Sequence, residues 1–255
     1  MKLTGIFKLT LIIAAFVCTQ PGQAQSSFVD IQKSFERTAP FFNRLADSLQ
    51  KQFAAKKLNW PPVNMYIRSF KYDRQLEVWI QDEANGAFKF FTRYAVCAQS
   101  GTTGPKRMEG DFQVPEGFYY INEFNPNSNY HLSLGLNYPN ASDRILSDSY
   151  HPGGDIYIHG NCVSVGCIPI KDGPIEELYV LATYVRASGQ DFIPVHVFPV
   201  KYNEKKSMEF LAEAERRKAI DPLFAARLKE AFTIFEEKKR LPIITVNKKG
   251  EYLIF

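Results

Sequence analysis

The chain has 255 residues, of which 45% are hydrophobic and 23% charged, and its formal net charge is +4. These proportions exclude a disordered or collagen-like chain, because the apolar fraction is sufficient for a buried core. Gly and Pro number 15 each and are scattered without a period, which argues against a solenoid or a propeller. One main domain with flanking segments is therefore expected.

Residues 1–24 have the pattern of a secretory signal peptide. Lys2 and Lys8 precede an apolar run over 9–17, and Gly22-Gln23-Ala24 supplies the small residues of a cleavage site. The run is too short to cross a bilayer, which takes about 20 apolar residues. Lipid modification at Cys18 is the alternative, and the bulky residues before it disfavour it. We therefore expect an exported chain with no transmembrane segment after cleavage.

The distribution of charge excludes a nucleic-acid partner. Without residues 1–24 the chain keeps 29 basic and 27 acidic residues, so its expected net charge is +2. The basic residues adjoin acidic ones, as at 204–206 and 236–240. This pattern is typical of solvated helix faces and not of a surface that follows a phosphate backbone.

The hydrophobic pattern predicts an α+β protein with a mostly antiparallel sheet and helices at one side and at both ends. Apolar residues recur every three or four positions in three segments, which predicts helices at about 38–60, 174–189 and 221–239. Alternating or β-branched segments predict strands at 63–67, 76–80, 88–98, 118–121, 155–159, 193–197, 243–246 and 252–255.

The densest group of reactive side chains lies between residues 158 and 167. His159 is expected at the end of a strand, and Cys162 and Cys167 follow in a stretch that bears two glycines. A thiol becomes a nucleophile when a neighbouring imidazole takes its proton, since the free thiol has a pKa of ~8.5 and imidazole of ~6.5. The chain can fold back and bring Cys167 to His159. Gly166 would let backbone N–H groups approach a substrate carbonyl, as an oxyanion hole requires.

Other interpretations of the cysteines stay open at this point. Three cysteines remain after signal cleavage, so at least one thiol should be free or paired elsewhere. Cys162 could form a disulfide with Cys167, or both could join His159 in a zinc site of unusual spacing. Cys97, in an aromatic strand, is expected to be a buried small hydrophobe. His196, in a late strand, is expected to be a structural residue.

Several motifs follow one another in a recognisable order. They are Gly104-Pro105-Lys106, Glu109-Gly110-Asp111, Pro115-Glu116-Gly117, Ile158-His159-Gly160 and Ser164-Val165-Gly166-Cys167. Over about residues 63–200 the chain resembles the YkuD-type L,D-transpeptidases and, within them, the YafK-like branch. Val165 stands where the wider family has a histidine, and the spacing from His-Gly to Cys is shorter. Both departures are shared with the YafK-like branch.

The resemblance implies a β-sandwich-like catalytic domain over 63–200, flanked by an N-terminal helical segment at 25–62 and by C-terminal helices with a hairpin at 201–255. It also implies a role for each residue of the site. These roles are nucleophile for Cys167, general base for His159, oxyanion stabilisation at Gly166, orientation of the imidazole by Gly160 or Ser164, and contact with the donor substrate for His131.

The activity that the resemblance implies is cell-wall chemistry without a cofactor or a metal. The cysteine would form an acyl-enzyme with peptidoglycan tetrapeptide stems and release the terminal D-alanine. An amine acceptor would then give a cross-link or a wall-attached protein, which implies roles in cell-wall biogenesis and cell shape. Water instead would make the protein an L,D-carboxypeptidase or an amidase that hydrolyses wall links. A non-catalytic wall-binding module is a third alternative, and all three imply the periplasm or cell envelope.

Overall fold

The structure is a computed structural model and describes residues 27–255. The predicted signal peptide and Cys18 lie outside these residues. The helices are α1 (Phe28–Ser34), α2 (Ala39–Ala55), α3 (Ala141–Leu146), α4 (Asp172–Ala187), α5 (Lys205–Arg216) and α6 (Pro222–Lys238). The strands are β1 (Asn64–Phe70), β2 (Gln75–Gln81), β3 (Lys89–Ala95), β4 (Gly117–Asn125), β5 (Ser133–Leu136), β6 (Tyr157–His159), β7 (Ile168–Pro169), β8 (Ile193–Phe198), β9 (Ile244–Val246) and β10 (Tyr252–Ile254).

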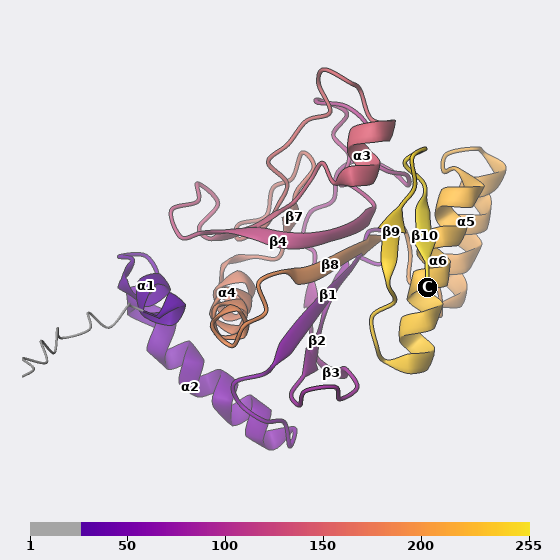
Figure 1. Ribbon diagram of the computed structural model, residues 1–255. Helices are drawn as coiled ribbons and strands as arrows, with labels where there is room; N and C mark the ends of the chain where they lie inside the picture. Colours follow the sequence, from indigo (N-terminus) through magenta and orange to yellow (C-terminus); the bar gives the residue numbers. More distant parts are fainter. Residues whose placement is uncertain (1–26) are drawn as a thin grey trace, which may run out of the picture.

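Eight strands form one sheet in the order β3-β2-β1-β8-β4-β5-β6-β7, and β9 and β10 form a separate hairpin. Within the large sheet, β1 and β8 are parallel, as are β6 and β7, and the other neighbours are antiparallel. The sheet curls so that its two ends approach: the N–H of Cys97, just after β3, donates to the carbonyl of Pro169 in β7 at 3.0 Å. The predicted α+β class with a mostly antiparallel sheet is confirmed (Figure 1).

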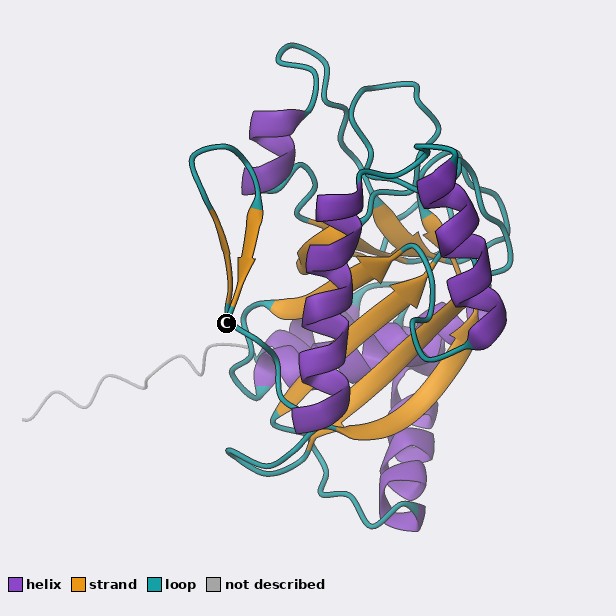
Figure 2. Ribbon diagram, turned by 90° about the vertical axis from the view of Figure 1, so that its right-hand side faces the viewer, coloured by secondary structure: helices purple, strands orange, loops and turns teal. Residues whose placement is uncertain are grey.

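Helices cover both faces of this sheet. In β1, Met65 and Ile67 share a buried cluster with residues of α2 and α4. Tyr66, between them in the sequence, points to the opposite face and packs edge-on against Phe235 of α6 at 4.8 Å. Figure 2 shows α6 lying across the strands on that side of the molecule. The N-terminal and C-terminal helical segments therefore bury opposite faces of the same strands.

A buried arginine joins α6 to the sheet. Arg68 is 1% exposed, and its guanidinium contacts Glu77 of β2 at 2.6 Å and Glu236 of α6 at 2.7 Å. Four aromatic rings surround the guanidinium, the nearest being Trp79 with its centroid at 4.7 Å. Arg68 is buried although it is charged, because α6 covers it and supplies a second carboxylate.

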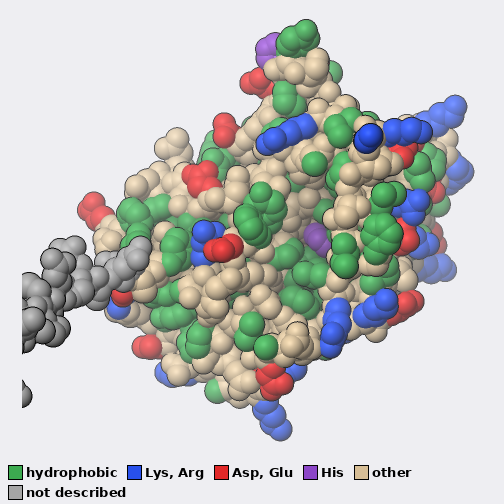
Figure 3. Space-filling view, viewed as in Figure 1, with side chains coloured by type: hydrophobic (Ala, Val, Ile, Leu, Met, Phe, Trp, Pro, Cys, Tyr) green, Lys and Arg blue, Asp and Glu red, His purple; other side chains and the backbone are tan. Residues whose placement is uncertain are grey.

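The surface of the described residues agrees with the charge pattern of the sequence. Figure 3 shows Lys and Arg side chains over α5 and α6 with Asp and Glu among them. Glu213 of α5, for example, forms ion pairs with both Arg216 and Arg217. Among residues 27–255 no helix has both the length and the hydropathy needed to cross a bilayer.

Candidate active site

The thiol of Cys167 and the imidazole of His159 lie on the same face of the sheet. Cys167 lines a cavity together with Ser133 and Tyr157. Ser133 of β5 is the direct partner of His159 in the antiparallel register of β5 and β6. Tyr157 precedes His159 by two positions in β6, so its side chain points to the same side. The fold therefore places the two residues that the sequence predicts to form the catalytic pair on the same side of the sheet.

The imidazole of His159 is held in one tautomer. His159 is 1% exposed, and its Nδ1 lies 2.5 Å from the carbonyl oxygen of Gly160. A carbonyl only accepts hydrogen bonds, so Nδ1 carries the proton and Nε2 keeps a free lone pair. The ring of Tyr130 packs against the imidazole with centroids 4.7 Å apart. Burial lowers the pKa of His159, although the hydrogen bond to Gly160 opposes this shift, so the ring is neutral near pH 7.

Cys167 is a free, half-buried thiol. Burial raises its pKa, and a hydrogen bond from the backbone of Tyr157 partly opposes that effect. Sγ donates to the carbonyl oxygen of Asp155 at 3.5 Å. The resting site therefore holds a neutral thiol and a neutral imidazole.

The other two cysteines form a disulfide with each other. Cys97, two residues after β3, is bonded to Cys162 in the loop between His159 and Cys167. The expectation that Cys97 is a lone buried hydrophobe is therefore wrong. The alternatives that used Cys162, a bond to Cys167 or a zinc ligand, are wrong for the same reason. The odd number of cysteines was the available signal, but it did not reveal which two would meet.

Ser164 and Gly166 shape the turn before Cys167. Ser164 Oγ donates to the carbonyl of Cys167 at 2.7 Å and accepts from the N–H of Gly166 at 3.1 Å. Gly166 has φ +144°, and a Cβ there would lie 3.2 Å from the carbonyl oxygen of Gln113. Of the two residues predicted to orient the imidazole, Gly160 contacts it and Ser164 organises this turn instead.

His131 lies beside the cavity wall. Its Nε2 is 2.8 Å from Oε1 of Glu176 in α4, and its backbone has φ +74°. The adjacent Tyr130 lines the Cys167 cavity. Tyr130 is not among the residues predicted for the site, although its position next to His131 in a turn rich in Asn is a signal that could have indicated it.

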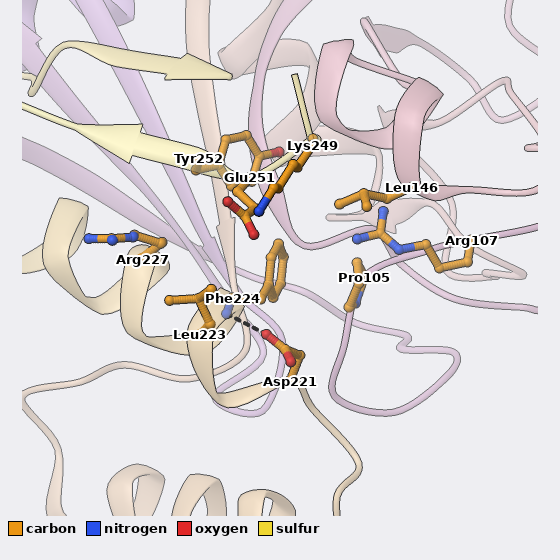
Figure 4. Close-up of a pocket in the computed structure, with 11 residues that line it drawn as sticks. Pro105, Arg107, Leu146, Asp221, Leu223, Phe224, Arg227, Lys249, Glu251 and Tyr252 are labelled. Atoms are coloured by element: carbon orange, nitrogen blue, oxygen red, sulfur yellow. Dashed lines mark hydrogen bonds between the residues drawn. The ribbon is translucent and has the colours of Figure 1, made fainter. Parts of the chain in front are cut away.

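Two of the cavities formed by the described residues are similar in volume, and one of them lies at Cys167. The one at Cys167 has a volume of about 450 Å³, and Asn125, Asn127 and Asn129 contribute to its wall. Another, of about 380 Å³, lies between the start of α6, the β9–β10 hairpin and Arg107 (Figure 4). The residues that line it, such as Phe224 and Tyr252, include no thiol, hydroxymethyl or imidazole group. Of these two cavities, only the first is lined by a thiol.

Comparison with known proteins gives one family. Residues 66–197 match the YkuD family, described as the L,D-transpeptidase catalytic domain. The chain is 28% identical over 231 residues to YafK of Escherichia coli strain K12, whose name assigns an L,D-transpeptidase activity only provisionally; the match covers 89% of this chain and 84% of YafK.

Solved structures give more distant matches. The helical cell shape determining protein Pgp2 of Campylobacter jejuni matches with a TM-score of 0.44 and 19% identity over 72% of this chain and 73% of Pgp2. Bd1075 of Bdellovibrio bacteriovorus matches with a TM-score of 0.40 and 19% identity over 75% of this chain and 80% of Bd1075.

Proposed function

Because this chain belongs to the YkuD family of L,D-transpeptidase catalytic domains, we propose that it acts on peptidoglycan tetrapeptide stems through a cysteine acyl-enzyme. The observation that supports this proposal best is the state of His159. Its Nδ1 is bound to Gly160, and its free Nε2 belongs to a ring on the same sheet face as the Cys167 thiol. A general base for a thiol nucleophile needs a ring nitrogen with a free lone pair, and the fixed tautomer of His159 supplies one.

The proposed first step is acyl transfer to Cys167. Nε2 of His159 accepts the thiol proton as Sγ attacks the carbonyl at the L-centre of the diamino acid in the stem. The tetrahedral oxyanion is stabilised by backbone N–H groups. The N–H of Gly166 already donates to Ser164, so the N–H of Cys167 is the first candidate for this role. His159 then gives the proton to the nitrogen of the departing D-alanine, and a thioester remains. Such proton transfer contributes about 10²- to 10⁴-fold in rate.

The second step decides between transfer and hydrolysis. An amine that attacks the thioester gives a new amide bond and returns the thiol, with His159 accepting a proton from the amine. Water at the same position gives a free carboxylate and a shortened stem. We propose transfer as the main outcome, because the family is defined by that activity. Shortened stems without cross-links would instead support the hydrolase alternative.

The cavity at Cys167 suits a peptide substrate. Its volume of about 450 Å³ lies in the range of small-ligand sites. The amide side chains of its wall can both donate and accept, and each peptide group of a stem offers one N–H and one carbonyl. His131 is proposed to contribute to the donor site through the turn that carries Tyr130. The predicted catalytic domain over 63–200 and the periplasmic or envelope location belong to the same proposal.

The decisive experiment is intact-mass analysis of the protein after incubation with a tetrapeptide muropeptide. We expect a mass increase equal to the mass of the muropeptide minus that of the released D-alanine, and we expect it to map to Cys167. The adduct should be absent in Cys167→Ala and strongly reduced in His159→Ala. Product analysis then separates cross-linked dimers from shortened monomers. An unmodified protein, with Cys167→Ala still binding sacculi like the wild type, would refute the enzyme proposal and favour a wall-binding module.

A further inference from the structure

The N-terminal helical segment reaches the wall of the Cys167 cavity through one arginine. Arg37 lies in the turn between α1 and α2. Its Nη1 donates to the carbonyl of Ser128 at 2.5 Å and to that of His131 at 2.7 Å. One guanidinium nitrogen therefore holds two carbonyls, and these bracket Asn129 and Tyr130, which line the cavity.

The segment held by Arg37 also contacts the predicted base. The Tyr130 ring packs against the His159 imidazole at 4.7 Å. The carbonyl of Tyr130 lies 2.8 Å from the position that a Cβ on Gly160 would occupy, so this segment is in close contact with the backbone of the His-Gly motif. His131 has φ +74°, a conformation that costs energy in a residue other than glycine and needs support from neighbouring contacts.

We propose that Arg37 is a positioning residue that holds residues 128–131 so that Tyr130 covers the imidazole face of His159. The proposal depends on the proposed function in one respect, namely that His159 activates Cys167. It gives the helical segment before the catalytic domain a role in the chemistry of the site, although Arg37 itself contacts none of the reacting groups.

The effect of losing Arg37 can be worked out from its contacts. Without the guanidinium, two backbone carbonyls lose their charged donor, and one support of the positive φ at His131 disappears. The hydrogen bond between His131 and Glu176 and the buried face of α2 remain, so the chain still folds. The segment can then relax, and Tyr130 no longer fixes the imidazole plane. Small displacements of catalytic groups can cost about 100-fold in rate.

The test measures the reactivity of Cys167 in two ways, in the wild type, Arg37→Ala, Arg37→Lys and Tyr130→Ala. The first measurement is acylation by the tetrapeptide muropeptide, with kcat and KM determined separately. The second is alkylation of Cys167 by iodoacetamide, a reagent too small to need the cavity wall. Arg44→Ala, an exposed arginine on α2, is the matched control. Thermal unfolding confirms that each variant is folded.

We expect kcat and the alkylation rate to fall by about 10- to 100-fold in Arg37→Ala. Arg37→Lys, which keeps the charge but not the planar fork, should recover part of the loss, and Arg44→Ala should match the wild type. If Arg37 acts through Tyr130, the double variant Arg37→Ala/Tyr130→Ala should lose no more than the stronger single variant. Additive losses, or an effect on KM alone, would overturn the positioning role.

The outcomes also separate this proposal from the proposed function. In one outcome, the wild type forms no muropeptide adduct, but alkylation of Cys167 is slower in both His159→Ala and Arg37→Ala than in the wild type. This outcome would refute the proposed substrate and support the positioning role of Arg37. In the other outcome, the wild type forms the adduct and a folded Arg37→Ala variant is equally active. This outcome would support the proposed function and refute the positioning role of Arg37.

Discussion

Removal of the Cys97–Cys162 disulfide should destabilise the protein strongly. The bond joins residues 65 positions apart and connects the end of β3 to the loop that carries the nucleophile. Cys97 also donates its N–H to Pro169 of β7, so the bond lies where the two ends of the curled sheet meet. With a loop of this length, the chain-entropy model gives a stabilisation of about 4 kcal/mol at 25 °C.

The measurement is denaturant and thermal unfolding of the double variant Cys97→Ser/Cys162→Ser against the wild type. The double variant is needed because either single variant leaves a thiol that could exchange with Cys167. In a chain of this size about 4 kcal/mol corresponds to a decrease in Tm of roughly 8–16 °C. Reductant should lower the wild-type Tm by a similar amount and leave the double variant unchanged. A loss below about 1 kcal/mol would refute the view that this bond closes the sheet.

Two further predictions concern buried charges. Arg68→Ala should lower the free energy of unfolding by about 3–5 kcal/mol, because Glu77 loses its closest cation while remaining buried. Urea unfolding measures this loss. If the losses in Arg68→Ala and Glu77→Ala simply added in the double variant, the energetic coupling between the two side chains would be contradicted. Burial raises the pKa of the Asp143 carboxyl in the folded protein to about 6, whereas the same group has a pKa of about 4 in the unfolded chain. The folded state therefore binds this proton more tightly. The resulting stabilisation of the folded state is complete below a pH of about 4 and is lost as pH rises through about 6. Asp143→Asn should make the slope of unfolding free energy against pH less negative over that interval, and unchanged slopes would refute this linkage.

The sequence predicts the elements with a strong period and misses those that depend on tertiary contacts. The helix at α2 follows from the recurrence of Phe41, Leu45 and Leu49, all of which are buried. The hairpin of β9 and β10 follows from its turn residues. By contrast, β5 (Ser133–Leu136) has only four residues, too few for its alternation to stand out in the sequence, and all four are buried. The short α3 is also hard to predict from the sequence. Its start is set by a local hydrogen bond, in which the side chain of Asn140 accepts from the N–H of Asp143.

For the site, the sequence predicts the residues but not their contacts. The prediction of His159 and Cys167 rests on residue type and spacing, and the structure places both on one face of the sheet. Arg37 could not be found in this way, because it lies more than 90 positions from the carbonyls that it binds. The burial of Arg68 is hidden in the sequence for a related reason: α6, which covers it, begins more than 150 positions later.

The pairing of Cys97 with Cys162 bears on how the nucleophile survives in the oxidising compartment proposed for this chain. Cys162 precedes Cys167 by five positions, and as a free thiol it would be available to form a disulfide with the nucleophile. The bond to Cys97 removes that competitor. Burial also raises the pKa of Cys167, and oxidation follows thiolate character, so the neutral resting thiol reacts slowly with oxidants. Under the proposed mechanism, each catalytic cycle then begins with proton transfer to His159, which ties the reactivity of the sulfur to the position of that imidazole.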